Sequence, residues 1–304
     1  MRLGVIDIGT NSVKLLVANV RGKDILPVYE TSRQTRLGQG LYAECLLQDK
    51  PIRDTAAAVD ELLVLAKRDG CSDTRIIATS AVRESANAGD LLEALGQEVE
   101  ILSDIDEARL AFRGVLSCPC LCKRQALVVD VGGGSTEFIL GDAKGIWYHA
   151  SLPLGSVRLM EHHPVSDPPV KVELQTVCDS IDTRLGAATL LSLRGHIDAH
   201  GASPIILVGT GGMASLFAKM ELADDGYDRD RIEAVELSLV QVTAWRERLW
   251  HQPLAKRRTI SGLPPNRADV ALFGSLIYEQ VMRQLGFDTL RISTRGIRFG
   301  VLQS

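Results

Sequence analysis

The sequence predicts an α/β protein with two domains, each built on a mixed sheet. The chain has 304 residues, more than the roughly 100–200 of a single domain. An apolar strand that ends in Asp and enters a Gly-containing turn occurs near the N-terminus and again in the middle of the chain. Each copy is followed by another extended segment and then by helices and further strands. This order, hairpin strands first and parallel strands after a helix, is typical of a mixed sheet.

The first half of the chain begins with extended segments and continues with helices. A long helix is predicted by apolar residues on one stripe, namely Ile52, Ala56, Val59, Leu62, Leu63 and Ala66. A second helix should begin after Ser103, whose hydroxyl suits an N-cap, with Asp106 three residues later. The expected elements are strands at 2–8, 12–20 and 25–37, a helix at 51–68, strands at 75–78 and 99–102, and the helix after residue 103.

The second half repeats this order after a break in the pattern at residues 117–124, where we expect the chain to pass between domains. Three extended segments come first again, and helical periodicity follows them. The expected elements are strands at 126–131, 136–141 and 146–151, helical periodicity from 169 to 193, a strand at 204–208, a helix from residue 213, helices at 236–250 and 267–285, a strand at 289–292, and a short helix from about residue 296.

Composition excludes several classes of protein. Apolar residues make up 45% of the chain and charged residues 24%, which is ordinary for a globular protein. The net charge of −4 argues against a general binder of nucleic acid or membrane surfaces, which needs a broad basic field. Asp7 interrupts the short apolar N-terminal stretch, so no signal peptide or membrane span is predicted. We expect a cytoplasmic protein with reduced thiols, including the closely spaced Cys118, Cys120 and Cys122.

The repeated hairpin carries the strongest chemical signal. Residues 5–17 align without a gap on residues 128–140, and both copies keep the Asp at the strand end. A Gly-containing turn presents bare N–H groups to an anion, whereas an Asp beside a phosphate needs a hard cation between them. The pair therefore predicts two domains facing a shared phosphate–Mg²⁺ site. The candidate ligands of the metal are Asp7 and Asp130, and the candidate phosphate loops are Gly9, Thr10, Asn11 and Ser12, and Gly132, Gly133, Gly134 and Ser135.

Other nucleotide motifs do not fit these turns. A dinucleotide fingerprint needs the turn to open a helix, but β-rich residues follow both turns. A P-loop needs Gly-Lys-Ser/Thr, which neither turn has. A purely structural turn would explain either hairpin alone, and the repetition argues against that interpretation.

Glu107 and Arg83 are further candidates, each with a structural alternative. Glu107 lies in the first turn of a predicted helix, where it could accept a proton from water attacking phosphorus or simply cap the helix at the surface. Arg83 follows a buried strand, where its guanidinium could bind phosphate or pair with Glu84. Residues 209–212 could hold an anion or nucleotide at a helix start. A basic cluster of Lys256, Arg257 and Arg258, with Arg267 and Arg295, could line a groove for a polyanion.

Several segments together resemble the Ppx/GppA phosphatases, the exopolyphosphatases and guanosine pentaphosphate phosphohydrolases. The resemblance covers essentially the whole chain, and the Thr10-Asn11-Ser12 turn is the most specific part. The matching segments are Gly4-Val5-Ile6-Asp7-Ile8-Gly9-Thr10-Asn11-Ser12, Ala78-Thr79-Ser80-Ala81-Val82-Arg83-Glu84, Glu107-Ala108-Arg109, Asp130-Val131-Gly132-Gly133-Gly134-Ser135-Thr136-Glu137, Leu154-Gly155-Ser156-Val157-Arg158 and Ile292-Ser293-Thr294-Arg295-Gly296-Ile297-Arg298-Phe299-Gly300.

The resemblance implies a fold and roles for residues. The fold is two ribonuclease-H-like domains of the actin, sugar kinase and heat-shock ATPase superfamily, with a cleft between them. The domains would span 1–120 and 121–294, with 295–304 packing back on the first. Glu107 would be the catalytic base, Asp7 and Asp130 would bind Mg²⁺ or another divalent cation, and Arg83 and both turns would bind phosphate. A homodimer through residues 236–286 is also expected.

We therefore expect an Mg²⁺-dependent exopolyphosphatase that releases terminal orthophosphate from inorganic polyphosphate. Hydrolysis of the guanosine pentaphosphate 5′ end is the nearest alternative, because the chemistry is the same. An ATP-binding kinase or chaperone of the same fold and a non-catalytic sensor of polyphosphate or alarmone are further alternatives. The sensor gains weight from Asp104 and Asp106, because the family usually has Ser-Gly-x-Glu-Glu where this chain has Ser103-Asp104-Ile105-Asp106-Glu107.

Overall fold

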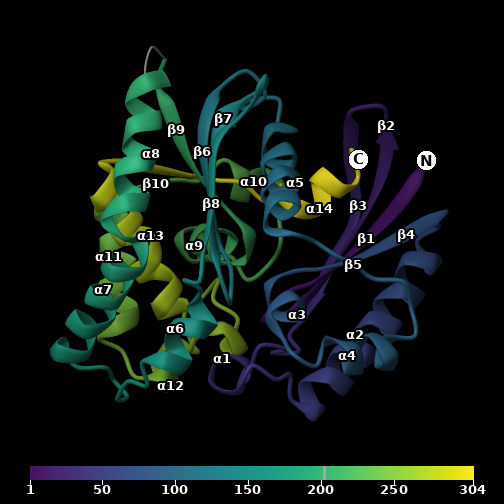
Figure 1. Cartoon of the computed structure of the whole chain (residues 1–304), viewed down its shortest axis with the longest axis horizontal. Coiled ribbons are helices and arrows are strands. Elements are labelled where there is room, and N and C mark those ends of the chain that lie inside the picture. The colour runs from purple at the N-terminus through teal and green to yellow at the C-terminus, as the bar shows by residue number, and fades with distance from the viewer. Residues whose placement is uncertain (201–202) are drawn as a thin grey trace. The chain divides into compact units, whose positions relative to one another are not determined.

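The computed structural model describes residues 1–200 and 203–304, and these form two compact units. Unit 1 comprises Met1–Cys118 together with Arg295–Ser304, and unit 2 comprises Pro119–Thr294. Each unit is α/β and contains one mixed sheet, as the sequence predicts (Figure 1). The chain thus leaves the first unit, completes the second, and returns to the first at its C-terminus.

Unit 1 is built on a five-stranded sheet in the order β3-β2-β1-β4-β5. The first three strands are antiparallel neighbours, whereas β4 pairs with β1 in parallel and β5 with β4 in parallel. The elements of unit 1 are β1 (Arg2–Ile8), β2 (Val13–Arg21), β3 (Asp24–Arg33), α1 (Leu41–Glu44), α2 (Asp49–Arg68), β4 (Asp73–Ala78), α3 (Ser80–Glu84), α4 (Ala88–Leu95), β5 (Glu100–Ile101), α5 (Asp104–Leu116) and α14 (Ile297–Val301).

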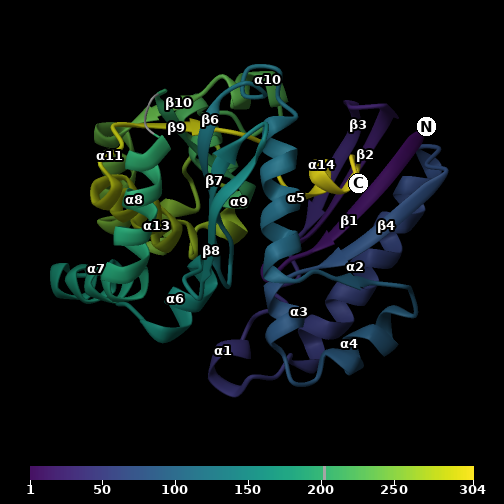
Figure 2. The same cartoon turned by 45° about the horizontal axis from the view of Figure 1, so that its top comes forward.

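Side chains of β1 alternate between two hydrophobic layers, because successive residues of a strand point to opposite faces. Ile6 and Ile8 pack with residues of α2 and α4. Val5 packs on the other face with Leu110 of α5 and Phe299 of α14. Figure 2 shows α5 and α14 side by side on this second face. The sheet of unit 1 is therefore covered by helices on both faces.

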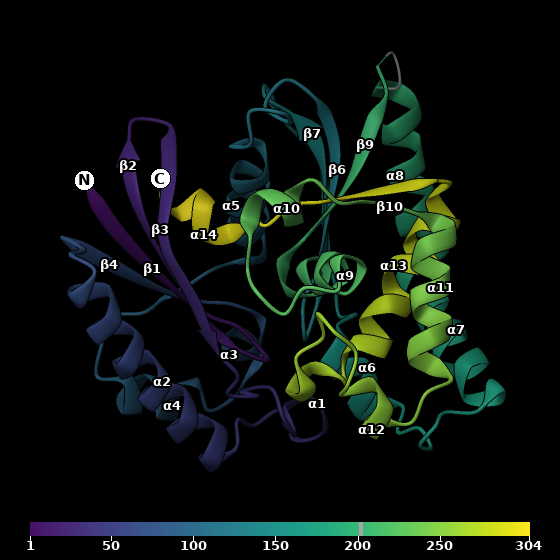
Figure 3. The ribbon, with the colours of Figure 1, turned by 180° about the vertical axis from the view of Figure 1, so that it is seen from behind.

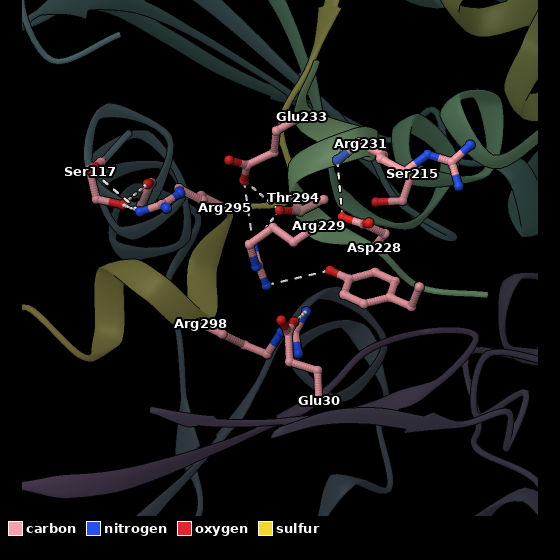
Figure 4. Close-up of polar contacts among 12 residues, drawn as sticks. Glu30, Ser117, Ser215, Asp228, Arg229, Arg231, Glu233, Thr294, Arg295 and Arg298 are labelled. Atoms are coloured by element: carbon pink, nitrogen blue, oxygen red, sulfur yellow. Dashed lines mark hydrogen bonds and ion pairs between the residues drawn. The ribbon is translucent and has the colours of Figure 1, made fainter. Parts of the chain in front are cut away.

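The C-terminal segment is held on unit 1 by close backbone packing and by a partly buried arginine. A Cβ on Gly300 would lie 1.9 Å from the carbonyl oxygen of Leu110, so only glycine allows α14 to approach α5 this closely. Arg298 donates to the carbonyl of Leu15 at 3.0 Å and lies 3.4 Å from Glu30 (Figure 4). These contacts join the end of the chain to β2 and β3.

Unit 2 is built on a six-stranded sheet in the order β10-β11-β9-β6-β7-β8. Its first three strands in the chain are again antiparallel neighbours, and β9 pairs with β6 in parallel. Its elements are β6 (Gln125–Val131), β7 (Thr136–Asp142), β8 (Gly145–Leu152), α6 (Ser156–His162), α7 (Lys171–Leu185), α8 (Ala187–His200), β9 (Ile205–Thr210), α9 (Gly211–Leu222), α10 (Arg229–Glu233), β10 (Glu236–Ser238), α11 (Leu239–Trp250), α12 (Leu254–Arg257), the 3₁₀ helix η1 (Pro265–Arg267), α13 (Ala271–Leu285) and β11 (Thr289–Ile292).

The core of unit 2 contains the largest buried aromatic side chains, Phe138, Phe217, Trp250, Phe273 and Tyr278. Seen from behind, α11 and α13 lie side by side (Figure 3). Trp250 of α11 meets Phe273 of α13 edge to face, with 6.4 Å between ring centroids. This geometry is favourable for aromatic pairs and joins the two helices.

The structure differs from the sequence prediction in two stretches of unit 2. The helical periodicity from 169 to 193 is interrupted at Gly186, whose φ of +62° ends α7 before α8 begins. Residues 236–238, predicted as helix, form β10, which pairs with β11. A three-residue strand depends on its distant partner more than on local sequence, so periodicity missed it.

The cysteines also differ in part from the expectation. Cys118 and Cys120 are disulfide-bonded, so the prediction of reduced thiols is wrong at these two positions. Cys45, Cys71, Cys122 and Cys178 are free. Across the described part of the chain, we find no helix with the length and apolar character needed to cross a bilayer.

Candidate phosphate and cation sites

The two Gly-containing turns have the same backbone structure. The N–H of Gly9 donates to the carbonyl of Ser12 at 3.1 Å, and the N–H of Gly132 donates to the carbonyl of Ser135 at 2.9 Å. Each turn joins two antiparallel strands, β1 to β2 and β6 to β7. The repeat seen in the sequence is therefore a repeat of the hairpin itself.

The first turn is held by a neighbouring loop. Arg36 donates its N–H to the carbonyl of Asn11 at 3.1 Å, and Gly38 donates to the carbonyl of Thr10 at 2.8 Å. In a trans peptide, the N–H of the next residue points away from the preceding carbonyl. The N–H groups of Asn11 and Ser12 are thus directed away from residues 36–38. This orientation suits an anion bound by the turn.

The second turn is held by the start of a helix. Ser156 donates its N–H to the carbonyl of Gly132 at 3.0 Å, and Arg158 donates its N–H to the carbonyl of Gly133 at 3.0 Å. The Nε of Arg158, a buried side chain, donates to the carbonyl of Gly134 at 2.7 Å. Three successive carbonyls therefore point toward α6. In trans peptides, the N–H groups of Gly133, Gly134 and Ser135 then point the opposite way.

The residues opposite the strand-end aspartates differ between the hairpins. Asp7 is opposite Lys14, and the Lys14 Nζ lies 4.0 Å from an Asp7 carboxylate oxygen. Asp130 is opposite Glu137, which is only 3% exposed and accepts a hydrogen bond from Ser151 at 3.0 Å. The sequence analysis did not single out Glu137. The signal was present, because an antiparallel register across the turn pairs the Asp with this residue.

Asp130 also lies against the start of α9. A Cβ on Gly211, whose φ is +81°, would lie 2.1 Å from Asp130 Oδ1. Strands β6 and β9 pair up to Asp130 and Thr210, which brings the carboxylate to the first turn of the helix. A helix N-terminus favours negative charge, so this carboxylate is stabilised there. An anion at residues 209–212, as predicted from the sequence, would therefore need a cation between it and Asp130.

The carboxylates of unit 2 fit a divalent cation of the Mg²⁺ type. Within residues 1–200 and 203–304, no cluster of three or more His, Cys, Asp and Glu side chains is placed to hold a metal ion. A cage made wholly of protein ligands is thus not formed. Mg²⁺ is usually held by one or two carboxylates together with substrate phosphates and water, and Asp130 and Glu137 match that donor set.

Glu107 and Arg83, predicted as separate site residues, contact one another in unit 1. Arg83 Nη1 lies 2.9 Å from Glu107 Oε2 and also donates to the carbonyl of Leu102 at 2.8 Å. Asp104 pairs with the same guanidinium. Glu107 is mostly buried, with 14% of its side chain exposed. The arginine therefore fixes the direction of the Glu107 carboxylate.

Asp106 contributes to the helix start. Ser103 caps α5, because its hydroxyl accepts the N–H of Asp106 at 3.2 Å, and the same hydroxyl donates to the Asp106 carboxylate at 2.6 Å. Asp104 and Asp106, the two residues that depart from the family pattern, therefore each have a polar partner in unit 1. Asp104 binds Arg83, and Asp106 completes the cap that begins the helix carrying Glu107.

The predicted basic cluster is not continuous. Arg257 is buried and lies 3.5 Å from Asp167, whereas its neighbours Lys256 and Arg258 are exposed. Arg295 belongs to unit 1 and donates to the carbonyl of Ser117 at 3.4 Å (Figure 4). These contacts give the arginines structural partners within their own units.

Comparison with known proteins agrees with these observations. A model of the Ppx/GppA phosphatase family matches residues 16–304. The whole chain is 30% identical to "Exopolyphosphatase 2" of Mycobacterium tuberculosis, covering 98% of that protein. It is 28% identical to "Exopolyphosphatase 1" of Mycobacterium bovis over 99% of this chain and 87% of that protein.

Solved structures show the same fold. The Ppx/GppA family member of Aquifex aeolicus has a TM-score of 0.79 and 28% identity, over 100% of this chain and 96% of that one. The structure of an exopolyphosphatase from Cytophaga hutchinsonii has a TM-score of 0.87 at 24% identity, over 99% and 96% of the two chains, which shows the fold alone. The repeated ribonuclease-H-like units and the match along nearly the whole sequence identify this chain as a phosphatase of the Ppx/GppA family.

Proposed function

We propose that this phosphatase is an exopolyphosphatase that removes the terminal phosphate of inorganic polyphosphate with the help of a divalent cation. The observation that carries the proposal is the repeated Gly-containing turn, present once in each unit, with Asp130 and Glu137 at opposite register positions beside the second copy. A linear polyanion offers several phosphates to such turns. The names of the mycobacterial relatives support the same substrate class.

Unit 2 supplies the cation site in this proposal. Asp130 and Glu137 would hold Mg²⁺ or another divalent cation, which when bound neutralises charge on phosphoryl oxygens. Asp7 would contribute less to cation binding, because the ammonium group of Lys14 already opposes the charge of its carboxylate. The N–H groups of Gly133, Gly134 and Ser135 would orient phosphate oxygens at this unit.

Unit 1 supplies the proton acceptor and the other turn. Glu107 would accept a proton from the attacking water, and Arg83 would hold the Glu107 carboxylate and contribute positive charge toward phosphate. The turn formed by Gly9, Thr10, Asn11 and Ser12 would bind phosphate. Phosphoryl transfer depends mainly on such positioning and charge stabilisation.

The test is phosphate release from polyphosphate, guanosine pentaphosphate and ATP, each with and without Mg²⁺. We expect Mg²⁺-dependent release with polyphosphate preferred, and a loss of about 10²–10⁴-fold in turnover for Glu107→Ala. Glu93→Gln, which changes an exposed carboxylate on α4, is the matched control.

Each alternative has its own outcome in this assay. Preference for the pentaphosphate selects the alarmone hydrolase, and preferential ATP cleavage selects the kinase-like interpretation. Binding of polyphosphate without release selects the sensor. Unchanged turnover in Glu107→Ala would remove this residue from the role of base.

We also propose, on the sequence grounds given above, a cytoplasmic homodimer that associates through the helical surface of residues 236–286. Val240 of α11 is 78% exposed, which gives this surface an apolar point of contact. Light scattering at micromolar concentration should give twice the chain mass, and a monomer throughout would contradict the dimer.

A further inference from the structure

Tyr278 of α13 reaches the ends of the two strands that lead to the candidate cation site. Its side chain is fully buried, and its hydroxyl oxygen lies 3.2 Å from both the carbonyl of Val129 and the carbonyl of Thr210. Val129 directly precedes Asp130, and Thr210 directly precedes Gly211. A hydroxyl has one proton to donate, so it is shared between two carbonyls of neighbouring strands.

The ring is held in place by its surroundings. The edge-to-face contact with Phe217 has 5.8 Å between ring centroids. Gly209 also lies close to the ring, because a Cβ there would lie 3.2 Å from the Tyr278 hydroxyl oxygen and 3.1 Å from the Leu290 side chain. The hydroxyl is therefore directed at the two carbonyls by packing, and a small displacement would change both distances.

The hydroxyl remains a donor under ordinary conditions. Burial raises the pKa of Tyr278 well above 10, and the negative charge of Asp130 acts in the same direction. A proton that does not dissociate gives a constant bridge between β6 and β9.

The bridged strand ends determine where the Asp130 carboxylate lies. Strands β6 and β9 pair as far as Asp130 and Thr210, and beyond this pair the chain turns into α9 at Gly211. Asp130 Oδ1 lies against Gly211, so its position depends on the spacing of the two strand ends. The hydroxyl reaches the carbonyl of Val129, one residue before the carboxylate, and the carbonyl of Thr210, the register partner of Asp130.

We propose that Tyr278 is a positioning residue, which fixes the ends of β6 and β9 and so aims the Asp130 carboxylate at a divalent cation. This inference rests on the proposed function for the cation, but not on the identity of the phosphate substrate. Residues that hold a metal ligand without binding the metal themselves commonly affect the metal affinity, because they set the orientation of that ligand.

The experiment measures Mn²⁺ binding by electron paramagnetic resonance, without substrate, on the full-length protein and its variants. Tyr278→Phe removes the hydroxyl and keeps the ring, and we expect it to weaken Mn²⁺ binding about 3- to 10-fold, the size of one hydrogen bond. Gly209→Ala keeps the hydroxyl but displaces it, so the same direction is expected.

Ser275→Ala is the matched control. Ser275 lies on the same helix, is fully buried, and donates to the helix carbonyl of Leu272 at 2.7 Å. We expect this variant to lower the melting temperature, as Tyr278→Phe does, but to bind Mn²⁺ within twofold of wild type, on the order of experimental scatter. Circular dichroism verifies that each variant is folded.

The outcomes separate this inference from the proposed activity. Wild-type Mn²⁺ affinity in both Tyr278→Phe and Gly209→Ala would overturn it, as would an equal loss in Ser275→Ala. Absence of Mn²⁺ binding in the wild type would overturn it together with the cation assignment. Weakened binding in Tyr278→Phe supports it even if no phosphate is released from polyphosphate, a result that would contradict the proposed activity alone.

Discussion

The two hairpins share a backbone but differ in the charge across from the strand-end aspartate. In unit 1, Lys14 opposes Asp7 at 4.0 Å, so the pair is close to neutral. In unit 2, Glu137 opposes Asp130, so two carboxylates meet at the end of the same pair of strands. Like charges directly opposite one another destabilise a sheet unless a cation compensates them. From this difference we expect the cation to bind at the hairpin of unit 2 rather than at that of unit 1.

The turns also differ in what holds them. The first is bound by the loop around Arg36 and Gly38, and the second by the N-terminal N–H groups of α6 and by the buried Arg158. A helix start is a more rigid brace than a loop, because its backbone is fixed by its own hydrogen bonds. We therefore expect the second turn to keep its backbone conformation more strictly than the first.

The largest expected effect tests whether the cation binds at Asp130 and Glu137 rather than at Asp7. Asp130→Asn and Glu137→Gln should each weaken Mn²⁺ binding by at least about 100-fold, because each removes a direct ligand, whereas Asp7→Asn should change it less than about 3-fold. Electron paramagnetic resonance of free Mn²⁺ measures the affinity, and Asp198→Asn, an exposed carboxylate on α8, is the control. A loss in Asp7→Asn as large as that in Asp130→Asn would show that Asp7 contributes as much to cation binding as Asp130 does.

A second prediction compares two glycines that allow close packing against the turns. Gly38 lies in the loop that holds the first turn, and Gly155 directly precedes α6, which holds the second. A Cβ on Gly155 would lie 2.3 Å from the backbone carbonyl carbon and oxygen of Gly133, whereas a Cβ on Gly38 would lie 2.3 Å from a methyl group of Thr10. A side-chain methyl can rotate, but the backbone of a turn must shift. We expect Gly155→Ala to cost about 1–3 kcal/mol in the free energy of unfolding and Gly38→Ala less than about 1 kcal/mol.

Urea unfolding followed by circular dichroism measures this difference. Gly145→Ala serves as the control, since nothing lies within 4 Å of a Cβ at that position. Phosphate release should fall more in Gly155→Ala than in Gly38→Ala, because the distorted turn is the one beside the paired carboxylates. Equal losses of stability in Gly155→Ala and Gly38→Ala would contradict the proposed difference between a rigid support at the second turn and an adaptable one at the first.

Much of the fold was predictable because local sequence determines it. The strands and turns of both hairpins follow from short runs of apolar residues and from glycine, and the start of α5 follows from Ser103. Strand β10 was missed because three residues carry almost no pattern, and their partner β11 lies about fifty residues away in the sequence. The break at Gly186 was missed because apolar spacing continues on both sides of it.

Only those residues of the candidate site that stand in local sequence motifs were predictable. The turn residues and Asp7 and Asp130 stand in recognisable motifs, whereas Glu137 became apparent once the register paired it with Asp130. The contact between Arg83 and Glu107 joins two elements through tertiary structure. Tyr278 lies 149 residues from Val129, the residue whose carbonyl its hydroxyl reaches, and no motif links them. Contacts of this kind need the fold before they can be recognised.

The smallest expected effect comes from giving the first hairpin the charges of the second. Lys14→Glu places a carboxylate opposite Asp7, as Glu137 is placed opposite Asp130, so the turn of unit 1 should gain a second, weak Mn²⁺ site. Without substrate, its affinity should resemble that of the site in unit 2, because both then consist of two opposed carboxylates. Lys14→Gln removes the positive charge without adding a ligand and should gain no site. Titration followed by electron paramagnetic resonance gives the number of bound ions, and one ion in Lys14→Glu would mean that the difference between the hairpins depends on more than the residue opposite the aspartate.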